Sequence, residues 1–173
     1  IGLDVSTTKI GIFVLDDKGE QKFWDYLNLT SSNIEKDLLS RAVVVEEWFS
    51  SLSFESEEEL DWHIEAPLFI TGGMSNANTI AKLIAFNWLV RWLLHKQFTQ
   101  QAKQVNVNSA RKLVFGSMPK GVDRKLFVKE EVTKLFPEIL EIPKKYQDDI
   151  TDAYVIARAG YELRKAENSQ SES

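Results

Sequence analysis

The sequence predicts one α/β domain with a mixed five-stranded sheet flanked by helices. Three strand-like runs separated by short turns occupy residues 1–29, which indicates an antiparallel meander. Helical and strand-like segments then alternate, as they do where helices connect further strands of a sheet. The 173 residues show no internal repeat or linker and are numerous enough for a hydrophobic core. Residues 1–166 are therefore expected to form the domain, followed by a disordered tail at 167–173.

The meander is the first part of the predicted sheet. Residues 1–5 and 9–15 are rich in β-branched and apolar side chains and are separated by Ser6-Thr7-Thr8. Asp16-Asp17-Lys18-Gly19 is a turn signal, and 21–29 alternates enough to form the third strand. Short turns between all three strands favour antiparallel pairing.

Two helices and a fourth strand follow. Ser31-Ser32-Asn33 can cap a helix that ends near Leu52. The fourth strand covers 60–65 and stops before Pro67. Apolar residues cover nearly every face of the predicted helix at 77–98, so this helix is expected to be buried on several sides or to lie in a subunit interface.

The remaining elements continue the alternation. They are a fifth strand at 104–107, a short helix capped by Asn108-Ser109 and ending at Phe115, a loop at 116–121, and helices at 122–135 and 149–165.

Composition excludes several classes of site. The chain has no cysteine, so disulfides and thiolate metal sites are excluded, and its two histidines are far apart. The longest apolar stretch, 85–94, is interrupted by Asn87 and Arg91 and is too short to span a bilayer. With no signal peptide visible, we expect a protein of the cytoplasm, in a bacterium or a phage-infected host, that has no membrane partner.

Charge is distributed unevenly along the chain, whose formal net charge is −5. Residues 46–61 carry seven acidic side chains and no basic one. Residues 111–129 are basic, with one acid, Asp123, among Arg111, Lys112, Lys120, Arg124, Lys125 and Lys129. One basic face and one acidic face are compatible with nucleic-acid binding, although the sign of the net charge is not that of most nucleic-acid-binding proteins.

Four carboxylates are the strongest functional signal. Asp4 lies within an apolar strand, where an unpaired charge is costly, and Glu65 ends the fourth strand. Asp149 and Asp152 are three residues apart, so they share one face of a helix, although acids at a helix start also have a purely structural explanation. Clustered carboxylates repel one another unless cations neutralise them. A pair of Mg²⁺ ions, which prefer oxygen ligands, would meet that need.

These segments resemble a known family. Ile1-Gly2-Leu3-Asp4-Val5-Ser6, Ile64-Glu65 and Asp149-Ile150-Thr151-Asp152-Ala153 together are similar to the RuvC-type Holliday junction resolvases of the RNase H-like (ribonuclease H-like) superfamily. The resemblance covers nearly the whole chain, in the family's order. It implies an RNase H-like fold in which Asp4, Glu65, Asp149 and Asp152 are both catalytic residues and metal ligands for two Mg²⁺ ions, which Mn²⁺ can replace.

The resemblance also implies DNA-contacting residues. Lys120-Gly121-Val122-Asp123-Arg124-Lys125 is similar to the family's basic loop and helix start, and Lys125 is the first choice for a phosphate contact. Lys120 and Arg124 are second choices, and the basic stretch adds Arg111 and Lys112. Phe69 is a candidate for opening a junction, although it stands one residue later than the family pattern. Asn76 and Asn78 are candidates for a polar residue that faces DNA in the family.

The function implied is that of a metal-dependent endonuclease. It would resolve four-way (Holliday) junctions during DNA recombination and repair, through paired nicks made by a homodimer that associates through the 77–98 helix.

Other functions stay open at this point. Another branched DNA or an RNA-containing duplex could be the substrate, and a non-catalytic resolvase-like DNA-binding module would have the same fold. Gly2-x-Asp4-x-Ser6-Thr7-Thr8 also looks like the first phosphate loop of actin-like sugar kinases. Those enzymes need a second such domain, for which this sequence has no duplicated motif.

Overall fold

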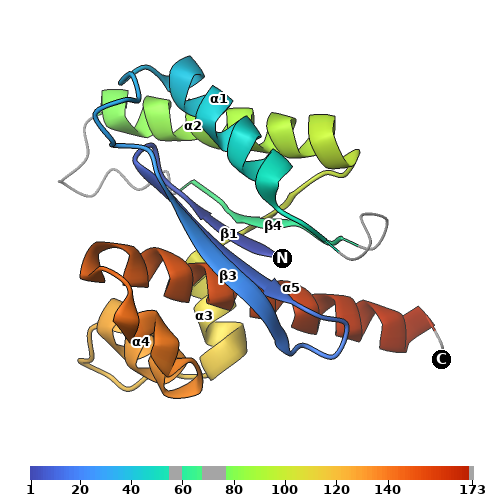
Figure 1. The fold of residues 1–173 in the computed structure, drawn as a ribbon. Helices are drawn as coiled ribbons and strands as arrows, with labels where there is room; N and C mark the ends of the chain where they lie inside the picture. The colour runs from blue at the N-terminus through green and yellow to red at the C-terminus, as the bar shows by residue number, and fades with distance from the viewer. Residues whose placement is uncertain (55–59, 68–76, 172–173) are drawn as a thin grey trace.

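A five-stranded mixed sheet forms the middle layer of the protein (Figure 1). The structure is a computed structural model that describes residues 1–54, 60–67 and 77–171. The strands lie in the order β3-β2-β1-β4-β5 and comprise β1 (Gly2–Val5), β2 (Lys9–Leu15), β3 (Gln21–Asn28), β4 (His63–Glu65) and β5 (Lys103–Val105). The first three strands are antiparallel, as predicted, whereas β4 runs parallel to β1 and β5 runs parallel to β4.

Helices cover both faces of the sheet (Figure 1). One face carries α1 (Leu38–Ser51) and α2 (Ala77–Phe98). The other carries α3 (Val107–Phe115), α4 (Arg124–Leu135), the 3-10 turn η1 (Pro137–Glu141) and α5 (Lys144–Ser171). This architecture confirms the predicted α/β class. None of the helices in the described ranges is long and apolar enough to cross a membrane.

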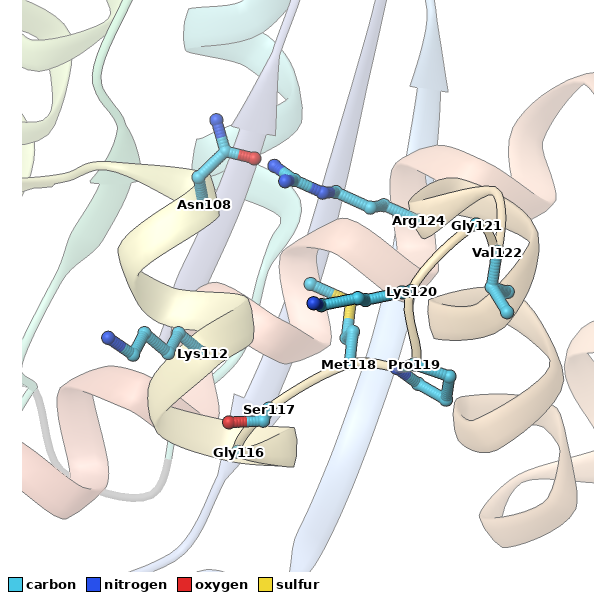
Figure 2. A pocket seen from close by; sticks show the side chains of 10 residues that line it. All are labelled: Asn108, Lys112, Gly116, Ser117, Met118, Pro119, Lys120, Gly121, Val122 and Arg124. Carbon is cyan, nitrogen blue, oxygen red and sulfur yellow. The ribbon is translucent and has the colours of Figure 1, made fainter.

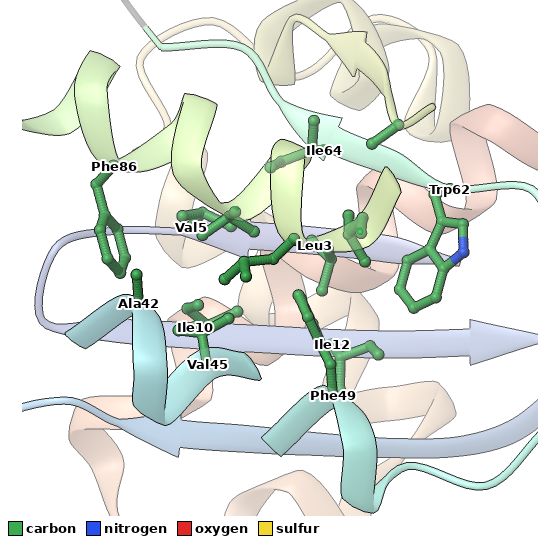
Figure 3. Close-up of a cluster of buried hydrophobic side chains, with 14 of the residues drawn as sticks. Leu3, Val5, Ile10, Ile12, Ala42, Val45, Phe49, Trp62, Ile64 and Phe86 are labelled. Atoms are coloured by element: carbon green, nitrogen blue, oxygen red, sulfur yellow. The ribbon is translucent and has the colours of Figure 1, made fainter. Parts of the chain in front are cut away.

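The face toward α1 and α2 is a core of large apolar side chains (Figure 3). Leu3 and Val5 of β1 and Ile10 and Ile12 of β2 point into it, in the alternation expected of strands with two different faces. Phe49 of α1 packs there at the centre of several ring contacts.

The opposite face lets α5 approach the strands closely. A Cβ atom at Gly2 would lie 2.2 Å from the backbone oxygen of Ala153, and one at Gly11 would lie 2.5 Å from the backbone oxygen of Asp149. Any other residue at these two positions would push α5 away. Gly11 is also the antiparallel partner of Asp4, so α5 passes directly over the strand position that carries this acid.

Several predicted boundaries were wrong, chiefly because the capping residues were different ones. Asp37, rather than Ser31–Asn33, accepts hydrogen bonds from the first turn of α1. Asn106 caps α3 in place of Asn108-Ser109, and Asp123 caps α4, which starts at Arg124 rather than Val122. Each of these side chains accepts from two of the four backbone N–H groups that a helix leaves unpaired at its start.

The last helix is longer at both ends than predicted. It begins at Lys144, directly after Pro143, and continues through Ser171, so residues 167–171 are helical rather than a disordered tail. Asp149 and Asp152 therefore lie beyond the first turn of α5. Attraction to the helix start thus does not account for these two acids, because the macrodipole acts mainly within the first turn.

Candidate functional site

Asp4 and Glu65 form the strand half of an acid cluster. β1 and β4 are parallel neighbours, and the pairing of Leu3 with Ile64 places Asp4 beside Glu65 at the same edge of the sheet. Their carboxyl groups share a hydrogen bond. Burial raises the pKa of Asp4 well above its usual range, and the charge of Glu65 raises it further. Burial also raises the pKa of Glu65, although the hydrogen bond from Asp4 opposes that shift. The hydrogen bond between them raises the pKa of Asp4 and lowers that of Glu65, which favours the proton on Asp4.

Asp149 and Asp152 form the helix half. Both side chains are buried on the face of α5 that lies against the sheet, and each meets a basic residue. Lys9 Nζ lies 2.7 Å from Asp149 Oδ2, and Arg111 Nη2 donates to Asp152 Oδ1 at 2.6 Å. Burial raises the pKa of Asp149, while the ammonium of Lys9 pulls it down.

The two halves act on each other through charge. Both Asp149 and Asp152 contribute to the raised pKa of Asp4, and Asp152 also raises the pKa of Glu65. Such mutual repulsion requires short separations in a partly desolvated place. The structure therefore brings the four acids singled out in the sequence into one cluster, from three elements that are far apart in the chain.

The chemistry of the cluster fits hard divalent cations. All four side chains offer carboxylate oxygens, the ligands that Mg²⁺ and Mn²⁺ prefer. Within residues 1–54, 60–67 and 77–171, however, no three acidic or histidine side chains are already arranged around a common metal position. In this arrangement one oxygen of Asp149 lies against Lys9 and one oxygen of Asp152 accepts from Arg111.

Lys125 is the predicted DNA contact that reaches the acid cluster. It lies in the first turn of α4, where Asp123 accepts from its backbone N–H at 2.8 Å. Its charge lowers the pKa of Glu65, together with that of Arg111. Lys125 is also exposed.

A basic hollow of about 570 Å³ lies between α3 and the start of α4 (Figure 2). The predicted contacts Lys112, Lys120 and Arg124 line it, and Figure 2 shows the guanidinium of Arg124 directed toward Asn108 on α3. Met118 adds apolar surface to the floor. We call this region the basic hollow.

Arg111 differs from the other predicted DNA contacts. Its side chain is only 6% exposed and its guanidinium is paired with Asp152, so a direct role on the DNA-facing surface was the wrong interpretation. Asn78 is exposed in the first turn of α2. Phe69 and Asn76 lie outside the described residues.

Two residues of the site were missed in the sequence. Lys9 was read only as part of a strand, although a lysine in an apolar, β-branched run is a signal of the same kind as Asp4. Asn87 is fully buried in α2, where its Nδ2 donates to the backbone oxygen of Glu65 at 2.9 Å. Gln104 donates to the amide oxygen of Asn87 at 3.3 Å. The signal in the sequence was the presence of an amide side chain within an apolar helical stretch. The role of Asn87 is to hold the end of β4 that carries Glu65.

Comparison with known proteins identifies the fold. No protein-family model and no curated protein sequence matches this chain. Among solved structures, it is similar to Thermus thermophilus RuvC in complex with a Holliday junction substrate, with a TM-score of 0.60 and 16% identity over 95% of this chain and 93% of that one. A second Thermus thermophilus RuvC structure matches with a TM-score of 0.59 and 16% identity over 95% of both chains. The resemblance to RuvC-type resolvases is thus confirmed at the level of the fold.

Proposed function

We propose that this protein is a metal-dependent endonuclease that cleaves branched DNA, with the four-way junction as its preferred substrate. The observation that carries the proposal is the cluster of Asp4, Glu65, Asp149 and Asp152 on a RuvC-like fold. A structural scaffold has no use for four interacting carboxylates at the edge of a sheet, because their repulsion is destabilising. A nuclease that binds cations has such a use.

The residues of the chain have separable tasks in this proposal. Asp4, Glu65, Asp149 and Asp152 would hold two Mg²⁺ ions, or Mn²⁺ in their place, which activate a water and stabilise the leaving oxygen. Asp4 has to release its proton before it can act as a ligand. Lys125 meets the phosphate beside the acids, and Asn87 fixes the end of β4 that carries Glu65.

The basic hollow would hold the DNA backbone away from the point of cleavage. Lys112, Lys120 and Arg124 present three positive charges around the basic hollow. Phosphate contacts of this kind supply much of the affinity for DNA and position it without reading its sequence. Contacts of this kind do not distinguish branched from linear DNA. In this proposal a branch is recognised because two of its arms reach two active sites at the same time.

A homodimer would supply the two sites, and α2 is the proposed interface. Trp88 and Trp92, four residues apart on α2, are 60% and 57% exposed. Leu39 and Val43, four apart on the neighbouring α1, are 69% and 53% exposed. Large apolar side chains exposed in pairs at helical spacing are typical of association surfaces.

The dimer has a direct test. Replacement of both Trp88 and Trp92 by lysine is expected to convert a dimer into a monomer in size-exclusion chromatography with light scattering. Leu163→Lys, at a comparably exposed apolar position on α5, is the control and should leave the mass unchanged. A wild-type protein that is monomeric at high concentration would exclude this part of the proposal.

The activity is tested by incubating the purified protein with labelled four-way, flapped, linear and RNA-containing duplexes in Mg²⁺. Symmetric nicks in the four-way junction are the expected result, in keeping with a role in recombination and repair in the cytoplasm of a bacterium or its phage-infected host. Asp4→Asn should bind the junction and not cut it, whereas Asp17→Asn, at the exposed turn before β3, should cut normally. Binding without nicks by the wild type would indicate a non-catalytic module, and ATP turnover without DNA would indicate a kinase-like protein.

A further inference from the structure

Lys9 occupies an unusual place for a lysine. It is the first residue of β2, and its Nζ lies 2.7 Å from Asp149 Oδ2 and 2.7 Å from the backbone oxygen of Lys145. Both acceptors belong to the first turns of α5. A residue distant in sequence thus ties the start of the last helix to the strand that pairs with β1.

The ion pair of Lys9 differs from that of Arg111. The side chain of Lys9 is 29% exposed, whereas that of Arg111 is 6% exposed. Arg111 presents a rigid guanidinium from α3, a helix that packs against α5. Lys9 presents a compact ammonium with three donors at the end of a flexible stem. Of the two counterions, Lys9 is the more exposed and the more flexible, so it is the one that can move into solvent or toward a ligand.

A cation at Asp149 has to compete with Lys9. A carboxylate oxygen that lies 2.7 Å from an ammonium is a poor metal ligand, because two positive charges at one oxygen repel each other. Lys9 must therefore leave Asp149 when Oδ2 itself becomes a metal ligand. The ammonium of Lys9 then needs a new anionic partner close to the acid cluster. A DNA phosphate bound over the acids would be such a partner.

We propose that Lys9 is an exchangeable counterion, which holds Asp149 in the metal-free protein and contacts the scissile phosphate once Asp149 takes up a divalent cation. This rests on the proposed nuclease function. It adds a phosphate-contacting residue on β2 to the basic side chains of α3 and α4. It also makes cation binding at Asp149 weaker than the carboxylates alone would make it.

The first experiment measures Mg²⁺ binding by calorimetry in the absence of DNA. Lys9→Met keeps the length of the side chain and removes the competing charge, so we expect affinity to rise roughly tenfold, the lower end of what neighbouring groups contribute at metal sites. Lys9→Arg keeps a cation and should bind Mg²⁺ nearly as the wild type does. Lys145→Met removes a charge from the same helix turn, where the ammonium lies over the Tyr146 ring, and should change affinity far less. Equal affinity of Lys9→Met and wild type would overturn the proposal.

The second experiment tests the phosphate contact. A junction with one uncharged methylphosphonate at the mapped cleavage position is compared with an unmodified junction, in Ca²⁺ to suppress cutting. The substitution should weaken binding by the wild type severalfold more than binding by Lys9→Met, because only the wild type loses an ammonium–phosphate contact. Equal weakening in both proteins would count against the contact.

The two levels of the proposal fail differently. A wild-type protein that binds no divalent cation and cuts no DNA would overturn the nuclease function and the role of Lys9 together. A wild type that binds Mg²⁺ and nicks junctions, with Lys9→Met indistinguishable from it in both experiments, would overturn the role of Lys9 alone. Thermal unfolding of each variant establishes that the comparison is made on folded protein.

Discussion

The strand half and the helix half of the acid cluster solve the same electrostatic problem in different ways. Asp4 and Glu65 share a proton, and burial and mutual repulsion raise the pKa of both. Asp149 and Asp152 are each paired with a base. In the first half a shared proton lowers the repulsion between the two acids, and in the second half side-chain cations neutralise each acid.

The difference follows from where the acids lie. Asp4 and Glu65 stand on adjacent parallel strands, and within the described residues neither forms an ion pair with a basic side chain. The hydrogen bond between their carboxyl groups is what lowers their repulsion. Asp149 and Asp152 lie on a helix that passes between β2 and α3, and each of these neighbours contributes one cation. Metal ions would have to displace a proton from the first half and a side chain from the second.

The largest expected effect comes from breaking the buried ion pair of the helix half. Arg111→Met leaves Asp152 buried without its partner and should destabilise the metal-free protein by about 3–5 kcal/mol. Removing the second charge as well, in Arg111→Met with Asp152→Asn, should restore part of the loss. Denaturant unfolding without divalent cations measures both.

An exposed ion pair provides the control for this prediction. Lys134 and Glu131 are paired on the surface of α4, and Lys134→Met should cost about 1 kcal/mol or less. If Arg111→Met were no more destabilising than this control, the pairing with Asp152 would contribute little to the fold.

A smaller effect is expected from pushing the two halves apart. Gly11→Ala places a methyl group 2.5 Å from the backbone oxygen of Asp149, so α5 has to shift, at a cost of about 1–3 kcal/mol. Cleavage should fall as well, because the acids on α5 move with the helix. Denaturant unfolding and junction cleavage are measured on the same preparation.

The neighbouring position separates stability from activity. Ile10 points into the opposite core, so Ile10→Val should cost about 0.5–1.5 kcal/mol and leave cleavage unchanged. Loss of cleavage in Ile10→Val as well would mean that activity follows global stability rather than the position of α5.

The sequence was sufficient to predict the strand half but not the way in which the helix half is neutralised. Asp4 stands out because it interrupts an apolar strand, and Glu65 because it ends one. The partners of Asp149 and Asp152 depend on where α5 starts and how it lies along the sheet. The start of α5 was not predicted, because Pro143 was not recognised as the residue before the helix. The position of α5 along the sheet was not predicted, because its close approach at Gly2 and Gly11 depends on tertiary packing.

The order of the sheet shows the same limit. Turn signals such as Asp16–Gly19 predicted the meander, because short turns between neighbouring strands are encoded locally. That β4 lies beside β1 depends on packing through α1, and the sequence analysis made no prediction of it. The capping side chains were misplaced for a related reason, since several Asn, Asp and Ser residues compete for each helix start.

The last prediction uses pH to test the proton of the strand half. A carboxyl group with a raised pKa in the folded state binds more protons there than in the unfolded chain, so stability falls as pH rises. For the metal-free protein, the decline begins near the ordinary Asp value of 3.8 and continues through the raised pKa of Asp4. Asp4→Asn cannot lose a proton, so its Tm above neutral pH should exceed that of the wild type by roughly 2–4 °C.

Divalent cations should reverse this dependence. Asp4 must be ionised to act as a ligand, so the stabilisation of the wild type by Mg²⁺ should grow as pH rises and should be lost in Asp4→Asn. Thermal unfolding from pH 5 to 8, with and without Mg²⁺, measures both trends, and Asp17→Asn is the control because Asp17 lies at an exposed turn outside the acid cluster. The buried N-terminus and His63 have lowered pKa values and make stability rise with pH in both proteins, so the comparison is between wild type and Asp4→Asn. A Tm difference between these two proteins that does not grow from pH 5 to 8 would mean that Asp4 is already ionised. The strand half of the acid cluster would then not be stabilised by a shared proton, and this difference from the helix half would be lost.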